Sequence, residues 1–263
     1  MTPLIILGRF FLDFVGQTGG VFIMVGQIFR LIPRVFTNAR SILQQMDRIG
    51  LGSIPLVLVT SLFVGAVTSV QAAYQFHGYV PLRFVGTVVG KSVILELGPV
   101  LTALVVGGRV SASIAAELGT MKVTEQIDAM EMIAIDPVEY LVLPRAVAAT
   151  IMLPVLTIFS DLLAILGGMV TANVSIGLSY NMFANGLKLL FQSQDLVGGL
   201  LKTFVFGFII AVMGCYNGFE TRGGAEGVGM ATMKAVVASC LLILVSNYFL
   251  GTFFFRILFS PGA

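Results

Sequence analysis

The sequence predicts an all-α integral membrane protein, and three observations support that prediction. Of its 263 residues, 57% are hydrophobic and only 11% are charged, and the mean hydropathy is +1.00. A soluble domain carries about 25% charged residues, so this chain has too little polar surface to stay in water. Apolar runs long enough to cross a bilayer recur along the chain. They leave no room for a separate soluble domain.

The apolar runs predict five transmembrane helices in a membrane domain at 51–263, at about 51–73, 84–116, 144–172, 196–215 and 231–255. Residues 1–50 form a separate N-terminal region. Its apolar run, Phe14–Phe29, is interrupted by glycine and glutamine, is shorter than a span and is followed by arginines. This pattern favours an amphipathic helix embedded in the membrane interface, with its arginines toward the lipid headgroups. A sixth span is the alternative.

Basic residues gather before the first span, around residues 109–145, and around the loop before the last span. With five spans, all three groups lie on one side of the membrane. Cytoplasmic loops carry an excess of Lys and Arg, so we expect a cytoplasmic N-terminus. Six spans would place the N-terminal end outside and leave the other loops where they are.

Several function classes are disfavoured by the composition. The net charge of +2 is too small to argue for nucleic-acid binding, and two cysteines in apolar surroundings with one loop histidine, His77, predict no metal site. Residues 86–92, GTVVGKS, fall one residue short of a phosphate-binding loop and lie in an apolar helix. Gly86 and Gly90 instead form a face for close helix packing. We therefore expect no enzyme activity, no nucleophile–base pair and no cofactor in this chain.

The acidic residue Glu96 lies inside the second expected span. A carboxylate in a span costs about 2.5–3.5 kcal/mol, and such residues usually face a cavity or a partner. Pro99 disturbs helix hydrogen bonding one turn back, which frees a carbonyl near Leu95 beside the charge. We interpret Glu96 as a functional residue. The alternative is an ion pair with Lys91 or Lys202 that only fastens helices.

A stripe of small residues between 107 and 116, including Gly107 and Gly108, predicts close helix packing, either within one chain or against a second copy. An acidic helix follows, with Thr124 as its expected N-cap and Glu125 in its first turn. Its acidic residues are three apart, on one stripe. A short acidic helix joined rigidly to a span is typical of a docking element for another protein, and a solvated connector is the alternative.

The segments ELGPV at 96–100, GGRVSASIAAELGTM at 107–121 and TEQIDAMEMIAIDP at 124–137 resemble the signature of MlaE/YrbE-type permeases. These are the membrane subunits of lipid-transporting ABC systems that work with MCE proteins. The resemblance covers about residues 45–255. It implies five spans after an N-terminal membrane-embedded helix, and a homodimer in the bacterial inner membrane. It also implies cytoplasmic ATPases that bind ATP and Mg, often a STAS-domain regulator, a periplasmic MCE ring, and a role in outer-membrane lipid asymmetry.

The resemblance also implies site residues. A pocket between the two permeases holds a phospholipid, and Glu96 and Lys202 match pocket-lining positions. Leu95 and Asn247 stand where other members carry an arginine and an acidic residue, which leaves fewer charges in the pocket. In the family, the segment matching Glu125–Ile133 is the coupling helix that docks on the ATPase, and its polar residues here are Glu125, Gln126, Asp128 and Glu131.

The sequence therefore predicts the transmembrane subunit of an ATP-driven lipid transporter, with ATP hydrolysed by a partner. The second and fourth spans both run inward, so Glu96 and Lys202 both lie in the outer half of the membrane and can meet around one periplasm-facing cavity. The alternative is an ion-coupled channel or secondary transporter that uses Glu96, Asp161 and Lys202 as a relay and needs no ATPase.

Overall fold

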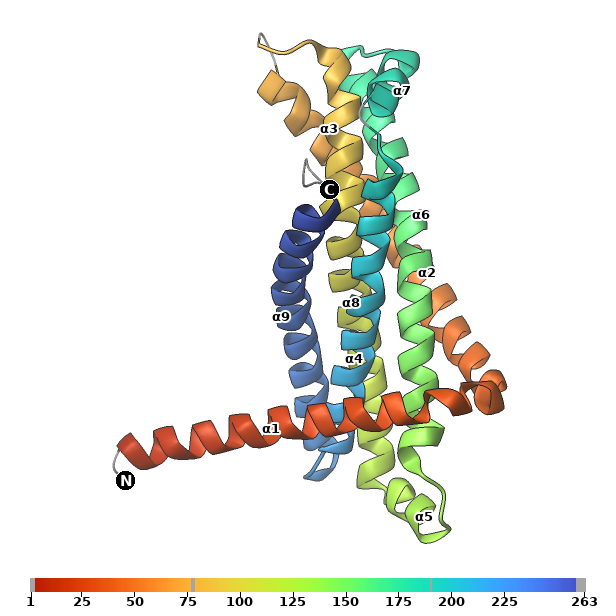
Figure 1. Cartoon of the computed structure of the whole chain (residues 1–263), viewed down its shortest axis with the longest axis vertical. Helices are drawn as coiled ribbons and strands as arrows, with labels where there is room; N and C mark the ends of the chain where they lie inside the picture. Colours follow the sequence, from red (N-terminus) through yellow and green to blue (C-terminus); the bar gives the residue numbers. More distant parts are fainter. Residues whose placement is uncertain (1–2, 77–78, 190, 259–263) are drawn as a thin grey trace.

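A computed structural model describes residues 3–76, 79–189 and 191–258, and His77 lies outside the described residues. All regular elements in these ranges are helical. The long helices α2, α4, α6, α8 and α9 run lengthwise, whereas α1 lies across one end of the bundle (Figure 1). The bounds are α1 Pro3–Leu31, η1 Ile32–Asn38, α2 Ala39–Phe76, η2 Leu82–Phe84, α3 Val85–Ser92, η3 Val93–Leu97, α4 Gly98–Val123, α5 Gln126–Met132, η4 Val138–Val142, α6 Leu143–Ile176, α7 Tyr180–Leu189, α8 Ser193–Phe219 and α9 Gly224–Leu258.

Six segments of the described chain are long and apolar enough to cross a membrane: 15–35, 39–76, 82–123, 138–176, 193–219 and 224–254. The first four expected spans each fall within one of the last five segments, and the fifth, 231–255, lies within 224–254 except for its final residue. The helices extend beyond the apolar runs, because α2 begins at Ala39 and runs without interruption through residue 50. The remaining segment, 15–35, belongs mostly to α1, which crosses the bundle instead of running along it (Figure 1).

Helices α2 and α6 pack along each other through glycines. A Cβ atom added at Gly65 of α2 would overlap the backbone of Ala164, and one added at Gly167 of α6 would overlap the backbone of Leu62. Small residues let helix backbones approach closely, which is how helices associate in lipid. These two glycines therefore set the distance between α2 and α6.

The small-residue faces expected from the sequence have different neighbours. Gly86 and Gly90 pack within the chain, because a Cβ atom at either would overlap α7, at Phe183 and Leu187 respectively. Gly107 faces Ile210 and Ile243. Among the described residues, nothing lies within 4 Å of a Cβ atom added at Gly108. Of the four glycines, Gly108 alone is therefore free to meet a second copy.

Two π-helical turns interrupt the lengthwise helices, and each precedes a proline. Turn η3 comes just before Gly98-Pro99, and η4 comes just before Leu143-Pro144. A proline ring clashes with the carbonyl one turn back and donates no hydrogen bond, and a wider turn relieves that clash. In each turn a basic side chain donates a hydrogen bond to one carbonyl oxygen. Lys202 donates to that of Leu95, and Arg145 donates to that of Leu141.

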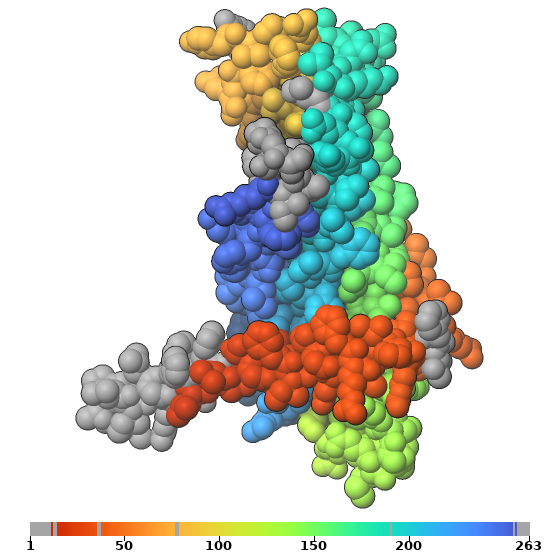
Figure 2. Space-filling view, in the orientation of Figure 1, coloured from red at the N-terminus to blue at the C-terminus, as the bar shows by residue number. Residues whose placement is uncertain are grey.

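Helix α1, α5 and the α8–α9 turn lie at one end of the molecule, and α7 lies at the other (Figure 1). The three basic groups of the sequence therefore share one end of the molecule. Helix α5 projects from that end as a separate knob beneath α1 (Figure 2).

Candidate functional site

Four sequence-predicted site residues gather where η3, α8 and α9 meet. The Lys202 Nζ atom lies 2.5 Å from Glu96 Oε1 and donates to the Leu95 carbonyl oxygen at 3.2 Å. The Asn247 amide donates to Glu96 Oε2 at 2.9 Å. The carbonyl that Pro99 was expected to free is thus one of the acceptors for Lys202. Of the two candidate partners of Glu96, Lys202 is the one in contact.

The two charges of this pair differ sharply in exposure. The Lys202 side chain is 5% exposed, whereas that of Glu96 is 49% exposed. Gly251 of α9 closes the site, because a Cβ atom there would lie 3.5 Å from both Glu96 Oε1 and Lys202 Nζ. Lys202 therefore lies behind Glu96, and Glu96 is the charge of this pair that a ligand can reach.

Glu96 lines a groove of about 880 Å³ between α2 and the continuous helix α3–η3–α4. Its walls are mostly apolar, and its polar members come from both helices. The lining residues are Phe63, Val64, Val67, Thr68, Gln71, Ala72, Gln75, Val88, Lys91, Ser92, Leu95, Glu96, Leu97 and Leu101. A long apolar groove with few charges suits a molecule with acyl chains and a polar head.

Asp161 of α6 does not join this cluster. It is buried, its Oδ1 atom points at Gly98, and that oxygen has no hydrogen-bond partner among the described residues. Within the same ranges, no hydrogen bond or ion pair connects it to Glu96 or Lys202. The relay of the ion-coupled alternative is therefore not assembled in this conformation.

Lys91 pairs with Asp195, a contact that the sequence did not suggest. The Lys91 Nζ and Asp195 Oδ2 atoms are 3.5 Å apart, and the side chains are 35% and 2% exposed respectively. Asp195 lies in the first turn of α8, just before the apolar run that predicts the fourth span. An acidic residue at the end of a span normally indicates a solvated position, and the sequence does not show that α3 covers it.

Helix α5 is held to the bundle by Ile127, which is 2% exposed, while Glu125, Asp128 and Glu131 lie on its exposed surface. Lys122 bonds to Asp128 at 2.6 Å. Thr124 is not an N-cap, because its hydroxyl donates to the Thr120 carbonyl at 2.8 Å. The expected cap is therefore wrong, and no side chain caps the start of α5.

The chain enters and leaves α5 through left-handed residues. Glu125 has φ 60° and Ala134 has φ 61°. This conformation costs a non-glycine residue about 1–2 kcal/mol, so the surrounding structure must enforce it. Between them, Met132 and Ile133 expose 87% and 68% of their surface. The sequence analysis identified the acidic stripe of α5 but not its exposed apolar tip. The run of apolar residues in MEMIAI, at 130–135, indicates that tip.

Ion pairs join neighbouring helices at the end of the bundle that carries α5. Glu117 of α4 bonds to the buried Arg145 of α6 at 3.0 Å and contacts Arg48 of α2 at 3.4 Å. Arg34 of η1 lies 2.5 Å from Glu139 of η4. Both helices that flank α5 are thus connected to neighbouring elements by ion pairs.

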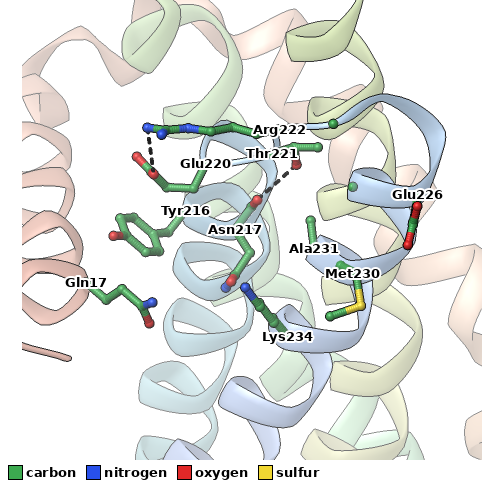
Figure 3. Close-up of a pocket in the computed structure, with 12 residues that line it drawn as sticks. Gln17, Tyr216, Asn217, Glu220, Thr221, Arg222, Glu226, Met230, Ala231 and Lys234 are labelled. Carbon is green, nitrogen blue, oxygen red and sulfur yellow. Dashed lines mark hydrogen bonds and ion pairs between the residues drawn. The ribbon is translucent and has the colours of Figure 1, made fainter. Parts of the chain in front are cut away.

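A second, polar cavity of about 540 Å³ lies between α1, the end of α8 and the start of α9 (Figure 3). Gln17, Tyr216, Asn217 and Lys234 are among the residues around it. The Tyr216 ring packs on α1, because a Cβ atom at Gly20 would lie 2.8 Å from it. This contact helps to hold α1 across the bundle.

The lengthwise apolar helices, the charged cluster beside a groove and the projecting α5 define a multi-pass membrane permease. The Permease MlaE family model matches residues 42–253, and the chain belongs to this family. A probable ABC transporter permease protein of Synechocystis is 43% identical over 235 residues, 89% of each chain. One of Rickettsia prowazekii is 42% identical over 216 residues, 82% of this chain and 83% of the relative.

The chain is also similar to the chloroplast protein trigalactosyldiacylglycerol 1 of Arabidopsis thaliana, with 36% identity over 234 residues. The match covers 89% of this chain and 67% of the plant protein. The chain is therefore the membrane subunit of an ABC transporter, and that class implies association with an ATPase.

Proposed function

We propose that this chain, as a homodimer, moves phospholipid through the inner membrane, driven by a cytoplasmic ATPase and coupled to a periplasmic MCE-domain protein. ATP and Mg bind to the ATPase, and a STAS-domain protein is a further candidate partner. Nucleotide-driven movement of the ATPase shifts α5, and α4 and α6 carry that movement toward the groove.

The observation that carries this proposal is the half-exposed Glu96 in a groove with apolar walls. Acyl chains suit the walls, and a polar headgroup suits the exposed carboxylate of Glu96, which can accept further hydrogen bonds. The name of the Arabidopsis relative refers to a galactolipid, which also favours a lipid substrate.

The shape of α5 supports its role as the coupling helix. Its buried Ile127 and its two left-handed ends fix the position of its exposed acidic and apolar residues. Helix α1, which lies across the same end (Figure 1), suits an interfacial position with five spans and a cytoplasmic N-terminus. The open surface at Gly108 is our candidate for the contact with the second copy.

Purification from native membranes tests the proposal. The full chain should co-purify with an ATPase, and mass spectrometry should find phospholipid in the complex. Reconstituted into liposomes, the complex should move lipid only with ATP. A preparation that lacks an ATPase and shows proton-dependent transport would favour the ion-coupled alternative instead.

A further inference from the structure

We propose that Lys91, and not Lys202, is the cationic contact for the phosphate of the lipid in the groove. This inference rests on the proposed function and assigns a residue within it. The resemblance to known permeases points to Lys202 as the basic pocket residue, so the two residues must be compared by what each can reach.

Lys202 is not available to a ligand in this conformation. Its side chain is 5% exposed, and its ammonium is already bonded to Glu96 and to the Leu95 carbonyl. Lys91 has a side chain that is 35% exposed, and it lines the groove. Among the described lining residues, Lys91 is the only lysine or arginine.

Asp195 positions the Lys91 ammonium group without occupying the hydrogen-bond donors of that group. The separation of 3.5 Å between Lys91 Nζ and Asp195 Oδ2 exceeds a good hydrogen bond. Neither Asp195 oxygen has a hydrogen-bond partner within the described ranges. An ammonium group carries three donors. The buried carboxylate therefore positions Lys91 at the groove, while the donors of Lys91 remain free for a phosphate.

The π turn places Lys91 and Glu96 on the same side of their helix. They are five residues apart, and the π turn at Val93–Leu97, which begins between them, is wider than an α-helical turn. Both residues line the groove. At a rise of about 1.5 Å per residue, they stand about 7.5 Å apart along the helix axis. The groove thus presents a cation and, about one turn deeper, an anion.

This pattern fits a glycerophospholipid. The phosphate bonds to Lys91, a hydroxyl or ammonium of the headgroup lies toward Glu96, and the acyl chains run along Phe63, Val64 and Val67 of α2. An apolar helix from a second copy would cover the same walls but would leave the free donors of Lys91 without an acceptor, whereas a phosphate supplies acceptors and negative charge. Charge complementarity therefore favours the lipid over a second copy.

The test compares two lipids that differ in the phosphate. The purified complex is incubated in detergent with phosphatidylethanolamine or with a diacylglycerol that has the same acyl chains, and bound lipid is measured by mass spectrometry. The test variant is Lys91→Met with Asp195→Leu, which removes both charges so that neither is left buried alone. Lys91→Arg keeps the cation, and Lys188→Met removes an exposed lysine of α7 that does not line the groove.

We expect the wild type, Lys91→Arg and Lys188→Met to prefer the phospholipid. The double variant should bind it about tenfold more weakly, the usual effect of losing one charged hydrogen bond. Its binding of diacylglycerol should stay the same. Thermal unfolding shows whether the double variant is folded. If it is not, Lys91→Gln with Asp195→Asn provides the same comparison and also leaves no buried charge alone.

Phospholipid binding by the folded double variant equal to that of the wild type would overturn the role of Lys91 and leave the proposed function intact. Displacement of the lipid by inorganic phosphate would also overturn it, because the site would then recognise a free anion. A double variant that keeps its lipid but loses its dimer would make the groove an interface between copies. A wild-type complex that binds neither lipid would overturn the proposed function itself.

Discussion

The ion pair between Glu96 and Lys202 should respond unequally to removal of its two members. From the sequence alone, both single changes should leave folding nearly intact. The structure revises this expectation, because Lys202 is enclosed while Glu96 is half exposed. Glu96→Gln leaves a buried ammonium without its counter-charge. Lys202→Met leaves a carboxylate that still reaches solvent or lipid and still accepts the Asn247 hydrogen bond.

The magnitudes follow from that asymmetry. Removing one partner of a buried pair costs about 3–5 kcal/mol, and the remaining Leu95 carbonyl places Glu96→Gln near the lower limit, about 3 kcal/mol. Losing an exposed pair costs about 1 kcal/mol or less. In a chain of this size, 1 kcal/mol shifts the unfolding midpoint by roughly 2–4 °C. Glu96→Gln should therefore lower Tm by about 6–12 °C, and Lys202→Met by no more than about 2–4 °C.

Thermal unfolding of the purified variants in one detergent measures the difference, and retained lipid is measured on the same samples. The double variant Glu96→Gln with Lys202→Met should regain the Tm of the wild type but not its lipid. Equal losses of Tm in the two single variants would refute the argument from burial. Full recovery of lipid by the double variant would refute the assignment of Glu96 to the lipid groove.

Gly65→Ala should strongly reduce the yield of folded protein, because its methyl group would overlap the backbone of α6, whereas Gly108→Ala should unfold within a few degrees of the wild type. Equal yields of the two would contradict the packing argument. Gly108→Leu should leave the chain folded but reduce the dimer fraction in light scattering, and an intact dimer would move the subunit contact elsewhere. Reversing Glu125 and Asp128 to Lys should abolish co-purification of the ATPase at a cost below about 0.5 kcal/mol per residue, and retained association with intact lipid transport would disprove docking through α5.

The sequence predicted those features that depend on local chemistry. Pro99 predicted a freed carbonyl near Leu95, and Lys202 takes that carbonyl. The apolar runs predicted the lengthwise helices, although α2 begins earlier than its apolar run, because backbone hydrogen bonds continue a helix through polar residues.

Features set by contacts between distant segments were not predictable in the same way. The pairing of Lys91 with Asp195 depends on how the continuous helix α3–η3 packs beside α8. Thr124 was misassigned as a cap because local preference favours it there, whereas burial of Ile127 and the left-handed Glu125 determine how the chain enters α5. The sequence also could not show that the Gly86 and Gly90 face is covered by α7 of the same chain.

The π turn at Val93–Leu97 makes the length of this span, and not only its residue types, part of the site. A π turn holds one residue more than the α-helical turn it replaces. Deleting one residue from it would leave an ordinary α-helix in which Lys91 and Glu96 were four residues apart and still shared a face. With every residue kept and the π turn replaced by α-helix, residues five apart would lie about 140° from each other around the axis. Lys91 would then turn away from the groove while Glu96 stayed in it. The presence of a cation and an anion together in the groove therefore depends on the number of residues in this turn as well as on their identity.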